Sequence, residues 1–137
     1  MSMTRREARE LAFSLLYEAT YYKPEEVPAL YEREMELRPF EDNPYLRAVV
    51  AGVSEKSAML DALIEKYSNG WKVRRISRVS LAILRLSIYE MFYVEDVPYN
   101  ASINEAVELA KKYNDDKAPA FINGVLNAVA EKEGLKK

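Results

Sequence analysis

The spacing of apolar residues along the chain predicts helices almost throughout. Residues 4–7 (Thr-Arg-Arg-Glu) form a capping-box pattern, and apolar residues then recur every three or four positions, which is the period of one helix face. We therefore expect a first helix over residues 4–21. A short acidic helix over 26–37 and a loop from Pro39 to Pro44 are expected to follow.

The middle of the chain predicts a long helix that ends in a turn. Asn-Pro is a typical helix start, and apolar residues continue at helical spacing over residues 43–68, with a kink expected near 52–54. The Asn-Gly pair at 69–70 is a typical stop, because a left-handed residue often follows the last helical turn. A short helical turn is expected at 73–76.

The last third of the chain predicts three further elements. Residues 77–95 begin with a serine cap and are apolar on most sides, which is typical of a central, buried helix. A second capping box, Ser-Ile-Asn-Glu at 102–105, predicts a helix that starts there and ends near Tyr113. Pro119 suits the first turn of a final amphipathic helix, and we expect the tail from Gly134 to be frayed.

These elements predict an all-α fold, with about seven helices in a single compact domain over residues 1–137. The length of 137 residues fits one domain, and a chain of this size buries roughly two thirds of its unfolded surface. The hydrophobic share of 49% and the nearly balanced charges exclude a disordered chain.

The composition excludes most catalytic and metal-binding chemistry. The chain has no cysteine and no histidine, so thiolate nucleophiles, imidazole bases and Cys- or His-based metal sites are absent. Glu105 and Glu108 are three residues apart, but no nucleophile accompanies them, and a capping role explains Glu105 better. We therefore expect no enzyme, no cofactor and no metal. No apolar leader or spanning run occurs, so we expect a soluble cytoplasmic protein.

The net charge of −2 hides an uneven distribution along the chain. Three arginines lie within the first nine residues, and residues 72–85 hold five cations and no acid. Residues 18–42 hold eight acids against three cations. Such polarity steers partners even when the sum of charges is near zero.

The first helix combines cations and aromatic rings in one sector. At 100° per residue, Arg5, Arg6 and Arg9 lie in one sector with Phe13 and Tyr17. Arginine forks bind phosphates, and aromatic rings stack with single-stranded bases. The alternative is a solvated helix face whose two rings close the edge of the core.

Two further groups of residues have similar alternatives. Arg85 lies inside the apolar stretch, so it either pairs with a carboxylate such as Glu90 or Glu105 or faces a partner. Tyr113, Lys117 and Phe121 surround a helix start, which suits a phosphate and a base. They equally suit rings that close the core at a turn.

Several blocks of sequence, in order and at matching spacing, resemble the NusB family of bacterial transcription antitermination factors. The resemblance covers about residues 4–17 and 71–126. Its blocks are Arg5-Arg6-x-Ala8-Arg9-Glu10 with Leu16-Tyr17, Trp71 with Arg75-Ile76, Val79-x-x-x-Ile83-Leu84-Arg85-Leu86-x-x-Tyr89-Glu90, Asp96-Val97-Pro98, Ile103-Asn104-Glu105-Ala106-Val107-Glu108-Leu109-Ala110-Lys111, and Phe121-Ile122-Asn123-Gly124-Val125-Leu126.

The resemblance implies an all-helical fold of two small bundles packed together. It also implies that the protein pairs with NusE, a ribosomal protein, and binds single-stranded boxA RNA. This assembly joins the RNA polymerase antitermination complex, notably on ribosomal RNA operons.

The resemblance also assigns residues by position. Its RNA-facing positions match Arg5, Arg6, Arg9, Tyr113, Lys117 and Phe121, and its NusE-facing positions match Tyr17, Arg78, Ser80 and Arg85. Ser80 stands where the family usually has an acid that pairs with the partner, so one salt bridge to NusE is lost. Lys117 replaces what is acidic in some members and adds a cation near RNA.

The leading hypothesis is therefore a factor that binds RNA and protein without catalysis. About four phosphate contacts, from Arg5, Arg6, Arg9 and Lys117, predict a salt slope near −3 at about −0.7 per contact. The alternative is a protein–protein adaptor without direct RNA binding. Self-association into a homodimer that hides the RNA site stays open as well.

Overall fold

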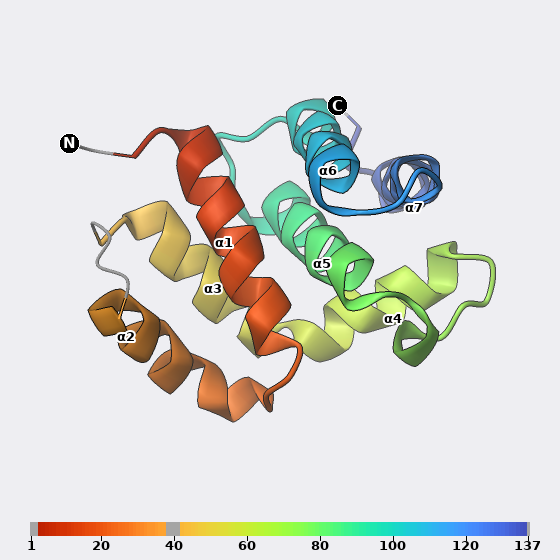
Figure 1. Cartoon of the computed structure of the whole chain (residues 1–137). Coiled ribbons are helices and arrows are strands. Elements are labelled where there is room, and N and C mark those ends of the chain that lie inside the picture. Colours follow the sequence, from red (N-terminus) through yellow and green to blue (C-terminus); the bar gives the residue numbers. More distant parts are fainter. Residues whose placement is uncertain (1–2, 38–41, 137) are drawn as a thin grey trace.

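In the computed structural model, residues 3–37 and 42–136 are described, and they form seven α-helices and two short 3₁₀ helices (Figure 1). This confirms the all-α prediction. The elements, in order, are α1 (Arg5–Ala19), η1 (Pro24–Glu26), α2 (Val27–Leu37), α3 (Pro44–Glu55), α4 (Ser57–Tyr67), η2 (Val73–Arg75), α5 (Arg78–Tyr93), α6 (Tyr99–Tyr113) and α7 (Ala118–Lys132). Of the loop predicted from Pro39 to Pro44, residues 39–41 lie outside the described residues.

The first helix begins as its sequence predicts. The Thr4 hydroxyl accepts a hydrogen bond from the Glu7 backbone N–H at 3.1 Å, and the Glu7 carboxylate accepts one from the Thr4 N–H at 2.8 Å. This reciprocal pair satisfies two backbone donors that the first turn leaves without helical partners. The cap therefore fixes the direction in which the neighbouring arginines leave the helix.

The long helix predicted over 43–68 is two helices. The chain leaves helical geometry at Lys56, with φ −100° and ψ 13°, rather than bending near residues 52–54. Each half buries its own apolar face, with Val49 and Val53 on α3 and Leu60 and Ile64 on α4. The break lets the two faces meet the core from different directions, which one straight helix would not allow.

The predicted capping box at residues 102–105 is wrong. Helix α6 begins three residues earlier, at Tyr99 directly after Pro98. Ser102 lies inside the helix, is buried, and bonds the Glu90 carboxylate on α5 instead of a backbone N–H. The tertiary partner of this serine outweighs its local capping preference, which is a common reason for such errors.

The prediction that the tail frays from Gly134 is wrong as far as Leu135. Gly134 takes a left-handed backbone conformation, with φ +73°, as is usual after a helix end. The Leu135 N–H then donates to the Ala130 carbonyl at 2.8 Å, and its side chain packs against the core. The turn thus holds Leu135 against the end of α7.

Helix α5 is the central element of the fold. It contacts α1 and α3 on one side and α4, α6 and α7 on the other, so it joins two groups of helices (Figure 1). Its predicted burial is confirmed, because Leu81, Ile83, Leu84 and Ile88 are almost fully inaccessible. Among the described residues, no helix is long and apolar enough to cross a membrane.

We expect opposite effects from two glycine substitutions. A Cβ at Gly52 would overlap the phenol ring of Tyr89, so Gly52→Ala should lower the free energy of unfolding by about 1–3 kcal/mol. A Cβ at Gly124 meets nothing, so Gly124→Ala should raise it by about 0.5–1 kcal/mol. Urea unfolding followed by circular dichroism measures both, and equal effects would contradict the packing of Tyr89 against α3.

Candidate functional site

A buried ion pair lies beneath the arginine-bearing end of α1. Arg9 donates to both carboxylate oxygens of Glu90 on α5, with Nη2 at 2.8 Å and Nε at 3.0 and 3.1 Å. The two side chains are only 7% and 1% exposed. Charges this deeply buried need complete pairing, because an isolated charge in the protein interior is very costly.

Two other helices complete the pairing of Glu90. The Tyr45 hydroxyl on α3 donates to Glu90 at 2.7 Å, and the Ser102 hydroxyl on α6 donates to its other oxygen at 2.9 Å. Ser102 also contacts the Ser87 hydroxyl at 2.9 Å. One carboxylate on the central helix therefore joins α1, α3 and α6, and every described buried side-chain polar atom has a partner.

The protonation states of this network follow from burial and pairing. Burial opposes the charge of Arg9, but its hydrogen bonds to Glu90 and the charge of Glu90 outweigh burial, and the pKa of Arg9 is raised. Burial and the Glu90 charge also raise the pKa of Tyr45, so its hydroxyl stays a donor. Arg9 thus remains cationic, but its charge is directed inward.

This placement corrects the prediction that Arg9 lies on the RNA-facing surface. Its sequence sector was right, yet α6 covers that sector, and Glu105 adds an ion pair to Arg9 at 3.5 Å. The side chain has no free fork to offer a phosphate. It joins α1 to α5 through Glu90 and to α6 through Glu105.

Arg5 and Arg6 are exposed, as predicted. Arg6 is 78% exposed and donates from Nε to Glu105 at 2.9 Å. Arg5 pairs with the exposed carboxylate of Asp96 at 3.2 Å, and its guanidinium lies 4.5 Å from the centre of the Tyr45 ring. Because these acids hold the arginines only at the surface, both forks remain available for exchange with other anions.

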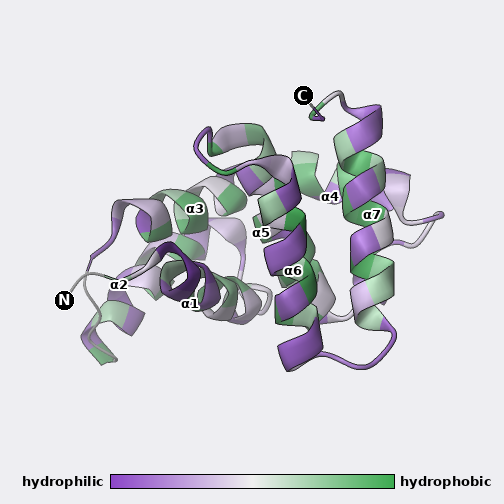
Figure 2. Ribbon diagram, turned by 90° about the horizontal axis from the view of Figure 1, so that it is seen from above, coloured by the Kyte–Doolittle hydropathy of each residue, from purple (hydrophilic) through white to green (hydrophobic). Residues whose placement is uncertain are grey.

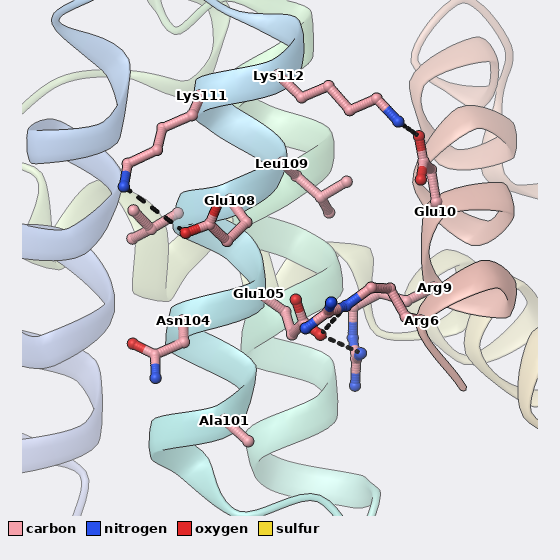
Figure 3. A pocket seen from close by; sticks show the side chains of 11 residues that line it. Arg6, Arg9, Glu10, Ala101, Asn104, Glu105, Glu108, Leu109, Lys111 and Lys112 are labelled. Carbon is pink, nitrogen blue, oxygen red and sulfur yellow. Dashed lines mark hydrogen bonds and ion pairs between the residues drawn. The ribbon is translucent and has the colours of Figure 1, made fainter. Parts of the chain in front are cut away.

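An open groove separates this end of α1 from α6. Figure 3 shows Arg6 and Arg9 reaching toward Glu105, and Lys112 reaching back to Glu10. Lys111 and Lys112 line the α6 side of the groove and are mostly exposed. Figure 2 shows hydrophilic positions along the outer face of α6.

Tyr113 lines an adjoining hollow that shares Glu10 with the groove. Its hydroxyl donates to Glu10, its ring lies 5.1 Å from that of Phe13, and 43% of the residue is exposed. The hydrogen bond from Lys112 at 2.6 Å and the one from Tyr113 lower the pKa of Glu10. Tyr113 therefore presents one ring face, while Phe13 is buried and belongs to the core, as the alternative interpretation proposed.

Lys117 and Phe121 lie together in a second hollow, beyond Tyr113. This hollow also includes Trp71, Arg75 and the Ser80–Asn114 pair. Lys117 is exposed and Phe121 is partly buried. The six candidate RNA residues therefore do not share one hollow. Arg6 and Arg9 line the groove, Lys117 and Phe121 line the second hollow, and Arg5 and Tyr113 lie outside both.

The four candidate partner residues lie in three different surroundings. Arg78 is exposed, stacks 4.1 Å from the centre of the Tyr21 ring and donates to the Thr20 carbonyl, while Tyr17 contacts Tyr21 through hydroxyls 3.3 Å apart. These residues form an aromatic and cationic patch at the end of α1.

Ser80 and Arg85 differ from this patch because they are less exposed and bond to other helices or turns. Ser80 is buried and accepts from Asn114 at 2.8 Å. Arg85 pairs through both arms with Asp61 on α4 at 2.8 Å, so pairing was right but neither Glu90 nor Glu105 is its partner. Asp61 lies 24 residues before Arg85, on another helix, so the sequence around Arg85 does not indicate this partner.

Sequence reasoning missed the buried network of Glu90 and Tyr45 and the exposure of Trp71. Glu90 is an acid inside a helix that is apolar on most sides, and that signal calls for a buried cation. Trp71 is the only tryptophan and is 51% exposed.

Among the described residues, no group of three or more acids suits a metal ion.

Removal of the buried arginine should be far more costly than removal of the exposed one. Arg9→Leu leaves the Glu90 carboxylate unpaired, so we expect a loss of about 3–5 kcal/mol in unfolding free energy. Arg6→Leu is the matched control, with an expected loss below about 1 kcal/mol. Urea unfolding measures both, and equal losses would refute a structural role for the Arg9–Glu90 pair.

The Glu10 carboxyl should titrate below its usual value of 4.5. Its lowered pKa means that the Lys112 and Tyr113 bonds stabilise the fold above pH 4.5, and that this contribution disappears as pH falls through the lowered pKa. Carboxyl ¹³C NMR measures the midpoint. Lys112→Met should raise the midpoint toward 4.5, and a wild-type midpoint at or above 4.5 would exclude the link.

The family model, the sequence relatives and the solved structures all indicate the same family. The model of the NusB family matches residues 6–131. The chain is 43% identical over 132 residues to transcription antitermination protein NusB of Ruminiclostridium cellulolyticum, covering 94% of this chain and 90% of the relative. The NusB of Bacillus pumilus is 44% identical over 131 residues, with 93% and 95% covered.

Solved structures agree with the sequence comparison. T. maritima NusB superposes with a TM-score of 0.85 at 30% identity, covering 96% of this chain and 94% of that one. A chain in the crystal structure of antitermination factors NusB and NusE in complex with dsRNA gives 0.81 at 27% identity, with 93% and 96% covered. The chain therefore belongs to the NusB family of transcription antitermination proteins.

Proposed function

We propose that this protein binds boxA-type single-stranded RNA together with NusE and so supports antitermination by RNA polymerase on ribosomal RNA operons. The observation that supports RNA binding is that the three α1 arginines differ in exposure. Arg9 is locked inward by Glu90, while Arg6 extends from the preceding turn beside a groove with two further lysines, and Arg5 extends beside Asp96. A related structure that holds NusB, NusE and double-stranded RNA supports the same two partners.

RNA binding in this proposal combines two physical terms. Arg5, Arg6 and Lys117 contact phosphates, and the rings of Phe121 and Tyr113 stack with bases. Arg9 contributes through the position of α1. The protein acts by holding its partners together, without a reaction of its own.

NusE binding is assigned to the patch formed by Tyr17, Arg78 and Tyr21. Its exposed Tyr21 ring, partly buried Tyr17 ring and exposed cation suit a protein interface, in which tyrosine and arginine are enriched. Ser80 is buried and bonded to Asn114, so it contributes shape rather than the salt bridge that an acid would make. Arg85 supports the neighbouring helix through Asp61.

The salt dependence of RNA binding tests the electrostatic term. Without Arg9, three phosphate contacts remain, so the slope of log K against log salt should be near −2, at about −0.7 per contact on single strands. Arg6→Gln should reduce the slope by about 0.7, and Phe121→Ala should cost roughly 1–3 kcal/mol of binding. Fluorescence anisotropy of a labelled boxA-like RNA, with and without NusE, measures all of these values.

Arg47→Gln is the control for charge alone. Arg47 is an exposed cation on α3 that pairs with Glu32 and Asp42, away from the groove. It should change neither slope nor affinity. If NusE is captured while no RNA binds at any salt concentration, the protein is a protein–protein adaptor and the RNA proposal fails.

A further inference from the structure

A small cavity lies between the loop after α4 and the start of α7. Its volume is about 230 Å³, below the roughly 300–1,000 Å³ of pockets for drug-sized ligands. The rings of Trp71 and Phe121 both line it, and Ile76 and Ala118 add apolar surface. Its aromatic lining suits a planar ring.

The backbone holds Trp71 in place while its side chain stays in water. Asn69 and Gly70 both take left-handed conformations and turn the chain. The Trp71 N–H then donates to the Ser68 carbonyl at 3.2 Å, and the Ser68 hydroxyl donates to the Trp71 carbonyl at 3.1 Å. The Trp71 side chain is half exposed and therefore open to a ligand, and its fixed backbone lowers the entropic cost of binding.

The rim of the cavity is mainly cationic. Arg75 and Lys117 both line it and are exposed. Asp115 is the acid among the lining residues, and its carboxylate accepts the N–H groups of Lys117 and Ala118 at 3.0 Å. The Asp115 charge is thus directed to the start of α7, and the two cations remain to attract an anion that carries a planar group.

We propose that this cavity takes one unpaired nucleobase of the bound RNA, stacked on the Trp71 indole, with Arg75 and Lys117 on the flanking phosphates. The inference rests on the proposed RNA function and extends it, because it adds Trp71 and Arg75 to the interface. Phe121 forms another wall of the same cavity, so both rings serve one base. A planar base between phosphates matches aromatic walls with a cationic rim better than a peptide does.

Trp71 provides its own reporter, because the chain has no other tryptophan. A boxA-like single-stranded RNA is titrated into the full chain, with and without NusE. Anisotropy of labelled RNA reports binding, and tryptophan emission, corrected with N-acetyltryptophanamide, reports stacking. We expect quenching that saturates with the anisotropy, and RNA with one abasic position should bind without quenching.

Variants separate stacking from other effects. Trp71→Ala should weaken RNA binding by roughly 5- to 150-fold, and Trp71→Phe should retain most of the affinity. Tyr93→Ala is the matched control, because Tyr93 is 44% exposed and lies at the other end of α5. The affinity of the Tyr93→Ala variant for RNA should equal that of the wild type.

Two results would overturn the inference and differ in what else they exclude. If RNA binds with unchanged tryptophan emission and Trp71→Ala binds normally, the nucleobase cavity is refuted while the proposed function stands. If neither signal responds to RNA, with or without NusE, both the cavity assignment and the RNA function fail.

Discussion

The Arg9–Glu90 ion pair is the constraint on which the arrangement of the helices depends. Glu90 lies on the central helix and is almost inaccessible to solvent, so its charge must be matched within the protein. Arg9 supplies the charge, and Tyr45 and Ser102 supply the remaining hydrogen bonds. These four residues come from four helices, and a shift of any one helix would leave a buried polar group without a partner.

This constraint also shapes the surface above it. With Arg9 fixed, the preceding turn of α1 projects Arg6 from the edge of the α1–α6 groove, while Arg5 lies against Asp96 and the Tyr45 ring. Glu105 contacts both Arg6 and Arg9, so it connects the buried network to the exposed one. A buried charge and an exposed charge thus share one acid.

The sequence alone predicts most of the fold, because its capping and apolar patterns are local. Thr4 and Ser77 cap their helices as expected, and α5 is buried as its composition indicates. The failures involve partners distant in sequence. Ser102 resembles a cap but bonds Glu90, and Arg85 meets Asp61 across 24 residues. No periodicity encodes such contacts.

The candidate site was harder to predict for the same reason. A helical projection gives the sector of Arg9 but does not reveal that α6 covers that sector. The sequence also places Tyr113 and Phe121 near a helix start. It does not show that Trp71, from a distant loop, lines the same cavity as Phe121. Burial separates a binding arginine from a structural one, and burial depends on the packing of the whole chain.

The acids around the groove explain how a chain with a net charge of −2 presents a surface for an anion. Asp96 and Glu105 hold Arg5 and Arg6 through pairs that are open to solvent on at least one side. Such pairs contribute about 0–1 kcal/mol, so their exchange for RNA phosphates costs little. The buried pair of Arg9 is not exchangeable on these terms, since removing either partner costs several kcal/mol. The acids therefore hold the exposed arginines only weakly, and in the proposed RNA complex we expect only the surface cations to contribute to the salt dependence of binding.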